Sequence, residues 1–332
     1  MLIITGANGF VGQHLAPLAL KYFNSKDILC LSYDKDATLE KLGLKKLNKV
    51  GLKNILIDLV TKRGLGGLPK SPDIIIHMAA STDTAISDHS ANDIGTRNLL
   101  DALSPLKPKT HLVYISTAAV MSGREDCLKP FNDYSLPNPS NEYGRSKLRA
   151  EEFLKQQCRK YKFRLTIIRM NTIYGNDPRE NKMFKLLKKQ ILNNSFVARL
   201  NWPGLIGLIH VDDVAYVLLE LAKRKQAVGK TETYTLYAEN LSLSNISRLM
   251  YKEMGFSYRQ INLPEFLWEF CSKLRKYIPL FEKIIPLTFY NPLWRWGLIV
   301  DNVLWCESRK LFKVLPKWEP KKFEENVKDV IN

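Results

Sequence analysis

Short apolar runs alternate with helix-length segments along the first 120 residues of the chain. The apolar runs cover residues 2–5, 28–32, 55–57, 74–77 and 112–116. Strands that are apolar on both faces are typical of a parallel sheet covered by helices. Residues 12–22 and 92–103 have the pattern of helices, and a sixth strand at 165–169 follows a long helix at 143–161. This alternation predicts an α/β fold with a doubly wound parallel sheet.

Beyond Gly175 the pattern loosens. A helix-like stretch at 181–192 is followed by irregular sequence, interrupted by Pro and Gly, up to Ile209. Residues 210–213 then open another helix, and Asp212 and Asp213 suit its positive N-terminus. A length of 332 residues is enough for about two domains.

A glycine-rich segment at residues 5–12 follows the first strand directly and opens the first helix. In such a segment Gly6 allows a tight turn, Gly9 lets a pyrophosphate approach the backbone, and Gly12 lets the helix pack on the strand. The phosphates would lie at the helix N-terminus. The sheet is therefore predicted to be of the Rossmann type and to bind a dinucleotide.

The end of the second strand normally distinguishes NAD from NADP, because an acidic residue there binds the ribose hydroxyl and a basic residue suits the phosphate. Ser32 occupies that position and Asp34 follows two residues later, so the sequence leaves NAD or NADP open. Asp58 and Leu59, after the third strand, could reach the adenine, although Asp58 also fits an ordinary turn.

Catalytic chemistry is indicated by Tyr143 and Lys147, which are four residues apart and share one face of a helix. An ammonium near a phenol favours the phenolate and lowers its pKa toward the range that acid–base catalysis needs. Thr117, after Ser116 at the end of a strand, could hold a substrate oxygen and relay the proton. His77, at another strand end, is interpreted as structural.

With these motifs in order, the chain resembles the extended short-chain dehydrogenases/reductases, the NAD-dependent epimerase/dehydratase family. The matching segments are 5–12, 73–80, 92–100, 114–120, 143–147, 169–175 and 210–215. The resemblance implies that Tyr143 is the catalytic acid/base, that Lys147 tunes it and binds the nicotinamide ribose, and that Thr117 completes the triad. The cofactor residues that it implies are Gly6, Gly9, Phe10, Val11, Gly12, Asp58, Leu59, Met78, Ala79, Ala80 and Asn92, with Tyr143 and Lys147. Asn8, in the glycine-rich segment, and Ser32, at the end of the second strand, are expected at the cofactor as well. The substrate positions expected are Thr82, Asn171, Arg179 and Lys185.

Two departures from the family pattern bear on the reaction. Family dehydratases carry Asp-Glu directly after the catalytic Thr, whereas this chain has Ala118 and Ala119, so elimination of water is not expected. Many sugar-nucleotide members carry an arginine shortly before His210. Residues 204–209 contain none, so Arg179, Lys182 or Lys185 would have to supply charge for phosphates.

Lys and Arg number 50 against 33 Asp and Glu, for a formal net charge of +17. Residues 145–194 alone hold 14 Lys or Arg and 4 Asp or Glu. This excess fits solvated helix faces, or a surface that meets the phosphates of a substrate or of an anionic membrane. Nucleic acid is not expected as a partner, because no zinc-finger, helix-turn-helix or interleaved basic–aromatic motif is present.

Five scattered cysteines fit a reducing compartment better than a disulfide framework, and they make no zinc motif, so no metal is expected. No run of 18 apolar residues and no signal peptide before the first strand are found, which predicts a cytoplasmic protein. Five of the six Trp lie after residue 262, beside Lys and Arg. They form either a helical cap with inward-facing aromatics, or an interfacial surface that reaches the inner face of the membrane or a lipid-linked substrate.

The domain division expected is a nicotinamide-dinucleotide domain at 1–175, to which 208–240 returns, and a substrate lobe made of 176–207 and 241–332. The lobe's C-terminal part should be helical, aromatic and basic. A homodimer is left open.

The resemblance implies a sugar epimerase or 4-ketoreductase that acts on a nucleotide-linked or lipid-diphosphate-linked sugar during surface polysaccharide or glycan precursor synthesis. The alternatives are a hydroxysteroid-type dehydrogenase, with the same triad and an apolar substrate, and a non-enzymatic NAD(P)-binding sensor or scaffold.

Overall fold

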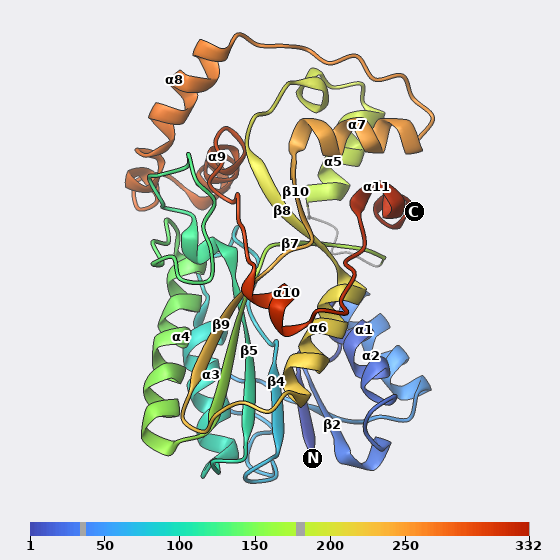
Figure 1. The fold of residues 1–332 in the computed structure, drawn as a ribbon, viewed down its shortest axis with the longest axis vertical. Helices are drawn as coiled ribbons and strands as arrows, with labels where there is room; N and C mark the ends of the chain where they lie inside the picture. The colour runs from blue at the N-terminus through green and yellow to red at the C-terminus, as the bar shows by residue number, and fades with distance from the viewer. Residues whose placement is uncertain (34–37, 177–182, 332) are drawn as a thin grey trace.

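The computed structural model describes residues 1–33, 38–176 and 183–331. Its main feature is a seven-stranded parallel sheet with the strand order β3-β2-β1-β4-β5-β6-β9 (Figure 1). The strands are β1 (Leu2–Thr5), β2 (Ile28–Ser32), β3 (Lys53–Leu56), β4 (Ile74–His77), β5 (His111–Thr117), β6 (Arg164–Met170) and β9 (Thr231–Leu236). The predicted Rossmann-type α/β fold is thus confirmed.

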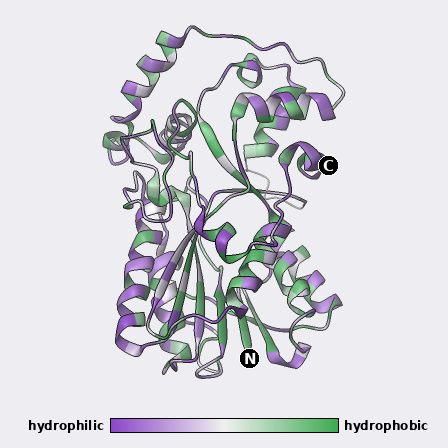
Figure 2. Ribbon diagram, viewed as in Figure 1, coloured by the Kyte–Doolittle hydropathy of each residue, from purple (hydrophilic) through white to green (hydrophobic). Residues whose placement is uncertain are grey.

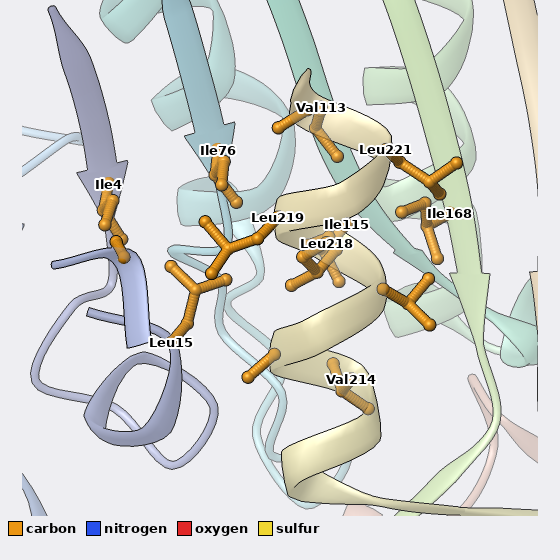
Figure 3. Close-up of a cluster of buried hydrophobic side chains, with 14 of the residues drawn as sticks. Ile4, Leu15, Ile76, Val113, Ile115, Ile168, Val214, Leu218, Leu219 and Leu221 are labelled. Carbon is orange, nitrogen blue, oxygen red and sulfur yellow. The ribbon is translucent and has the colours of Figure 1, made fainter. Parts of the chain in front are cut away.

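Helices cover both faces of this sheet. One face carries α1 (Gly12–Ala19) and α6 (Val211–Lys223), which pack on each other, and the other carries α3 (Ser90–Leu103) and α4 (Glu142–Tyr161). Helix α2 (Thr38–Lys49) lies beside α1. Figure 3 shows Leu218 and Leu219 of α6 among the side chains of Ile4, Ile76 and Ile115 from three strands. This apolar contact explains why both faces of the strands are hydrophobic.

A second, smaller unit lies beyond the C-terminal ends of the main strands (Figure 1). It is built on a three-stranded sheet of β10 (Glu239–Ser242), β8 (Leu205–His210) and β7 (Thr172–Tyr174), in which β10 and β8 are antiparallel. Its helices are α5 (Met183–Leu192), α7 (Leu243–Glu253), α8 (Glu265–Arg275), α9 (Leu287–Ile299), α11 (Phe323–Asn326) and α12 (Lys328–Ile331), while α10 (Lys310–Val314) packs on β9. Most of these elements share a core with Tyr174, Phe184, Trp202 and Phe323.

The predicted strands at 2–5, 28–32 and 74–77 have these bounds in the structure, and β5 and β6 are each one residue longer at both ends. The third strand begins earlier than expected, at Lys53, and helix α1 ends earlier, at Ala19. The interpretation of the sequence up to Ile209 as irregular was wrong for β8. Gly207 interrupts the apolar pattern of this strand. Glycine occupies this position because an added Cβ would lie 2.8 Å from Cγ of Asn171.

The C-terminal tryptophans mostly face inward, since Trp268, Trp294 and Trp318 are buried. Among the described helices, none is both long and apolar enough to cross a membrane.

Candidate active site

The turn between β1 and α1 has the shape of a phosphate cradle. Gly6 has a φ of +67° and an added Cβ there would lie 2.9 Å from the backbone nitrogen of Ala79, while a Cβ on Gly12 would collide with the carbonyls of Gly6 and Ala7. Gly6, Gly9, Phe10 and Val11 all remain half-exposed. A dinucleotide pyrophosphate needs close access to the backbone at a helix N-terminus, and the glycines of this turn allow that access. These residues therefore fit the expected cofactor.

A row of buried hydrogen bonds fixes this cradle to the end of β4. Thr5 Oγ1 lies 2.7 Å from His77 Nδ1, and the other ring nitrogen of His77 lies 2.9 Å from Thr96 Oγ1 on α3. The same threonine oxygen accepts the backbone N–H groups of Met78 and Ala79. Burial lowers the pKa of His77 to about 3, helped by the charge of Lys147, so the ring is neutral. His77 therefore joins two strand ends and a helix.

The residues expected on the adenosine side are engaged in the protein's own contacts. Asn8 donates from Nδ2 to the Tyr33 carbonyl at 2.9 Å, which ties the cradle to the end of β2. Ser32 is fully buried and donates to Asn54 Oδ1 at 2.6 Å, so its hydroxyl points to β3. Asp34 lies outside the described residues. The Ser32 hydroxyl therefore does not distinguish NAD from NADP.

Asp58 and Leu59 lie in the turn after β3. Asp58 Oδ1 accepts the backbone N–H groups of Val60 and Thr61, and although burial raises the pKa of Asp58, these bonds and Arg63 lower it overall. Leu59 is buried against Gly95 of α3, where an added Cβ would lie 2.9 Å from the leucine Cβ. The Asp58 carboxylate is thus held in place by the backbone N–H groups of its own turn.

The loop after β4 carries Ala79, Ala80 and Thr82, and it is fastened by Asn92 at the start of α3. Asn92 Oδ1 accepts the Ser81 N–H at 2.8 Å, and its Nδ2 donates to the Ser81 carbonyl and to Ser146 Oγ. Ser146 in turn donates to the carbonyl of Tyr143. This network links the expected cofactor loop to the first turns of α4.

Tyr143 and Lys147 stand at the beginning of α4, where Asn141 caps the helix by accepting the Gly144 N–H at 2.9 Å. An added Cβ on Gly144 would lie 2.7 Å from the carbonyl oxygen of Ala119, so the helix packs closely on η2 (Ala118–Met121). Thr117, at the start of η2, accepts the Ala119 N–H. The three expected catalytic residues therefore come from two elements in direct contact.

Lys147 is almost fully buried and donates to the carbonyl of Ile115, with its Nζ 4.4 Å from the centroid of the Tyr114 ring. Burial lowers the pKa of Lys147 to about 7, while Glu151 opposes the shift. Tyr143 is half-buried and its ring lies 5.5 Å from that of His89. The amine can thus exchange its proton near neutral pH.

A buried ion pair connects helix α4 to strand β6. Glu151, one turn after Lys147, receives hydrogen bonds from Arg169 of β6 at 2.9 and 3.1 Å, and Ser116 Oγ donates to it at 2.5 Å. The hydroxyl of Ser116, which precedes Thr117, is therefore already engaged by Glu151. The assignment of Thr117 rather than Ser116 to the triad rested on the resemblance, since both hydroxyls lie at the end of β5.

The C-terminal region packs against one side of this site, and the sequence did not predict this contact. We call Glu282, Tyr290 and Trp294, with the residues around them, the C-terminal wall. Tyr290 and Trp294 of α9 donate to Ser140, three residues before Tyr143. Glu282, ahead of α9, accepts the Glu142 N–H at 2.8 Å and pairs with Arg145 at 2.6 Å. These contacts join residues about 140 apart in the chain and have no short motif that could have revealed them.

The same wall reaches the loop after β4. Thr84 Oγ1 donates to Asn291 Oδ1 at 2.6 Å and accepts from Arg295 at 3.1 Å. A small cleft of about 60 Å³ lies between the loop after η2 and helices α8 and α9. Arg124, Arg275 and Lys276 are among the residues that line it, together with Ser122 and Ser140.

The expected substrate residues are dispersed. Thr82 lies in the loop after β4, and Asn171 lies between β9 and the C-terminal region, with its Nδ2 donating to the Leu236 carbonyl and to Cys306 Sγ. Lys185 is half-buried on α5, within the smaller unit. Arg179 and Lys182 lie outside the described residues. Across the described ranges, no group of three or more His, Cys, Asp or Glu side chains could hold a metal.

This arrangement has the layout of a Rossmann-type dinucleotide site, and comparison with known proteins identifies the family of the chain. The profile of the NAD dependent epimerase/dehydratase family matches residues 2–236, and the chain belongs to this family. The dTDP-D-glucose 4,6-dehydratase of Dictyostelium discoideum is 31% identical over 69% of this chain and 56% of its own length. A putative UDP-glucose 4-epimerase of Methanocaldococcus jannaschii is 25% identical over 77% of this chain and 83% of its own length.

Solved structures agree on the fold. The UDP-glucuronic acid 4-epimerase of Bacillus cereus, in complex with UDP-glucuronic acid and NAD, superposes with a TM-score of 0.74 at 18% identity and covers 99% of this chain and 97% of its own. The chain spans about half to two thirds of the length of the dehydratases that it matches.

Proposed function

We propose that this protein interconverts or reduces sugars by moving a hydride between a secondary alcohol carbon and a nicotinamide cofactor. The observation that carries the proposal is the placement of Tyr143 and Lys147 on the first turns of α4, against η2 and Thr117, at the end of β5. The class of reaction follows from this geometry together with family membership.

The cofactor proposed is NAD or NADP, held with its pyrophosphate over Gly6, Gly9 and Gly12. NAD is favoured by the family and by the bound cofactor of the Bacillus cereus epimerase. When bound by these residues, a nicotinamide cofactor would supply the hydride acceptor for oxidation of the sugar carbon and the hydride donor for its reduction. Asn92 positions the loop of Ala79 and Ala80 through Ser81, and Lys147 is the residue proposed to bind the ribose.

Tyr143 is the proposed acid/base. Its phenolate takes the proton of the sugar hydroxyl as the alcohol is oxidised, and the phenol so formed gives the proton back on reduction. The charged form of Lys147 stabilises the phenolate, and burial holds the pKa of Lys147 at about 7, where it can respond to the proton movement. Thr117 holds the same substrate oxygen.

Epimerisation or keto reduction is favoured over dehydration. Elimination of water needs its own acid and base beside the triad. The two positions after Thr117 are Ala118 and Ala119, both buried and neither able to carry a proton. The likeness to dTDP-D-glucose 4,6-dehydratases therefore reflects the shared fold and oxidation step.

The substrate is proposed to be a sugar on a nucleotide diphosphate or a lipid diphosphate, used in surface polysaccharide or glycan precursor synthesis. The cleft beside Ser140 supports this, since Lys276 lines it and can face phosphate oxygens, whereas Arg275 in the same lining is paired with Asp301. Lys185, Asn171 and Thr82 stay candidates for the same role.

A panel of sugars tests the proposal. The purified protein is incubated with NAD or NADPH and with UDP- and dTDP-linked hexoses, hexuronic acids and 4-keto sugars, and the products are followed by NMR. We expect conversion of at least one sugar nucleotide. Turnover of 3-hydroxysteroids with none of the sugars would overturn the proposal.

The same preparation separates epimerase from reductase. An epimerase regenerates its cofactor, so bound NAD should be found by mass spectrometry and conversion should need no added reductant. A protein that carries no cofactor but oxidises added NADPH with a 4-keto sugar is a reductase.

Partners other than the sugar are proposals too. A homodimer and a cytoplasmic location stay predictions, which sedimentation and fractionation can test.

A further inference from the structure

The C-terminal region exposes a dense set of large apolar side chains. We call these residues the aromatic face, and they come from α8, η4 (Ile278–Phe281) and the start of α9. They are Phe266, Phe270, Leu274, Tyr277, Leu280, Phe281, Ile284 and Phe289, and their exposed fractions range from 42% to 72%. Residues 266, 270 and 274 follow helical spacing and form one stripe on α8.

The exposure does not come from a loose segment. On the other side of the same elements, Trp268, Ile278, Tyr290 and Trp294 are buried. Arg275 of α8 pairs with Asp301 at 3.1 Å, and Glu282 pairs with Arg145 of α4 at 2.6 Å. The segment is therefore anchored inward while it presents the aromatic face to its surroundings, at the outer edge of the smaller unit (Figure 1). Figure 2 shows hydrophobic and hydrophilic residues side by side along α8.

The exposed charges along most of the aromatic face are positive, and its first residue, Phe266, lies between two exposed acidic residues. Between residues 270 and 289 the exposed charged side chains are Lys273, Lys276 and Lys283. Glu282, the acid within this range, is 12% exposed and is occupied by Arg145. Glu265 and Glu269 lie at the N-terminal end of α8. Exposed aromatics among lysines match a bilayer with anionic headgroups, where rings enter the interface and ammonium groups meet phosphates.

We infer that the aromatic face docks the protein on the surface of an anionic membrane, with α8 lying in the interface and no segment spanning it. Apolar area on this scale is uncommon on a soluble surface and usually marks an interaction site. A second protein molecule would also cover apolar side chains. The three exposed lysines between residues 270 and 289 favour lipid phosphate, because they would repel the same lysines of a second copy placed against them.

Docking in this orientation would bring the candidate active site to the membrane surface. The inner side of the same segment contacts Ser140, Glu142 and Arg145, next to Tyr143. The cleft with Lys276 opens between this segment and the loop after η2. Docking would favour a sugar whose diphosphate is attached to a lipid in that membrane, and this substrate preference rests on the proposed function.

Vesicle co-sedimentation of the full chain tests the docking. At low salt, we expect binding to vesicles of phosphatidylcholine with phosphatidylglycerol, and weak binding to phosphatidylcholine alone. The double variant Phe270→Ser/Phe289→Ser should weaken binding by about tenfold or more. The matched control is Leu192→Ser/Phe196→Ser, which removes two side chains of similar exposure, 58% and 61%, outside the aromatic face and should bind as the wild type does.

The lysines are tested separately. The triple variant Lys273→Gln/Lys276→Gln/Lys283→Gln should lose the preference for anionic vesicles, with about fivefold weaker binding for each lysine removed. Thermal unfolding confirms that each variant is folded.

Three outcomes would overturn the inference. The wild type could ignore both vesicles at low salt, the control pair could lose as much binding as the aromatic pair, or sedimentation could show a dimer that Phe270→Ser/Phe289→Ser dissociates. Vesicle binding needs no turnover, so an inactive protein that binds vesicles refutes the proposed function and leaves docking intact.

Discussion

The ammonium group of Lys147 lies in the protein interior, where its nearest groups are the Ile115 carbonyl and the face of the Tyr114 ring. Such a site disfavours positive charge, and burial lowers the pKa of Lys147 to about 7 from 10.5. A lysine kept there at a cost in stability is typical of a functional group rather than a structural one.

This cost has a defined pH dependence. Between about pH 10.5 and pH 7 the unfolded chain holds the Lys147 proton and the folded chain releases it, so stability falls as the pH falls through that window and levels off below it. Lys147→Met should raise the free energy of unfolding by about 1–4 kcal/mol near neutral pH, and the gain should shrink toward pH 10.

Urea unfolding at about pH 6.5 and about pH 9.5 measures the difference. Lys160→Met, which changes an exposed lysine on the same helix, should show no comparable pH dependence. A Lys147→Met protein that is less stable than the wild type at both pH values would contradict a stability cost from burial of the charged lysine.

At the scale of elements, the sequence was most informative where the pattern was local. β1, β2 and β4 are continuous apolar runs, and their bounds were predicted to the residue. The turn from Gly6 to Gly12 was equally readable, because Gly6 and Gly12 each stand where an added Cβ would collide with backbone atoms. β8 was missed because Gly207, which accommodates Asn171, breaks its apolar run.

The wall built by Glu282, Tyr290 and Trp294 could not be read from the sequence. Its partners, Glu142 and Ser140, lie about 140 to 154 residues earlier and are joined to it by tertiary packing alone. The inward and outward faces of the C-terminal helices were likewise ambiguous. Tryptophan turned out to be mostly buried, while phenylalanine makes up much of the exposed aromatic face.

The contact between α4 and η2 gives a test at this scale. Gly144→Ala would place a methyl group 2.7 Å from the Ala119 carbonyl and 2.9 Å from Pro139 Cβ, so the start of α4 must move and carry Tyr143 with it. We expect kcat to fall by about tenfold to a hundredfold, since small misplacements of catalytic groups are costly. Stability should fall by about 1–3 kcal/mol.

Gly66→Ala is the matched control, because no atom lies within 4 Å of its added Cβ. Steady-state kinetics and thermal unfolding of both variants provide the readout. Unchanged kcat in Gly144→Ala would show that the close approach of α4 to η2 does not position Tyr143.

At the scale of the whole molecule, the chain divides its tasks between two regions. The glycine cradle and the loop after β4 present backbone to a dinucleotide, and the C-terminal segment closes the site from the other side through Ser140, Thr84 and Arg145. The proposed acid/base stands where these regions meet. Cofactor binding and turnover should therefore respond separately to a change at Tyr143.

The central claim is that Tyr143 moves the proton in a hydride transfer on a sugar. The most direct measurement compares the wild type with Tyr143→Phe for NAD affinity, by calorimetric titration, and for turnover of the sugar identified in the panel. We expect similar NAD affinity and a loss of turnover of about 10²–10⁴-fold, as for removal of a general acid/base. A Tyr143→Phe protein that binds NAD and turns over the sugar at the wild-type rate would contradict the claim.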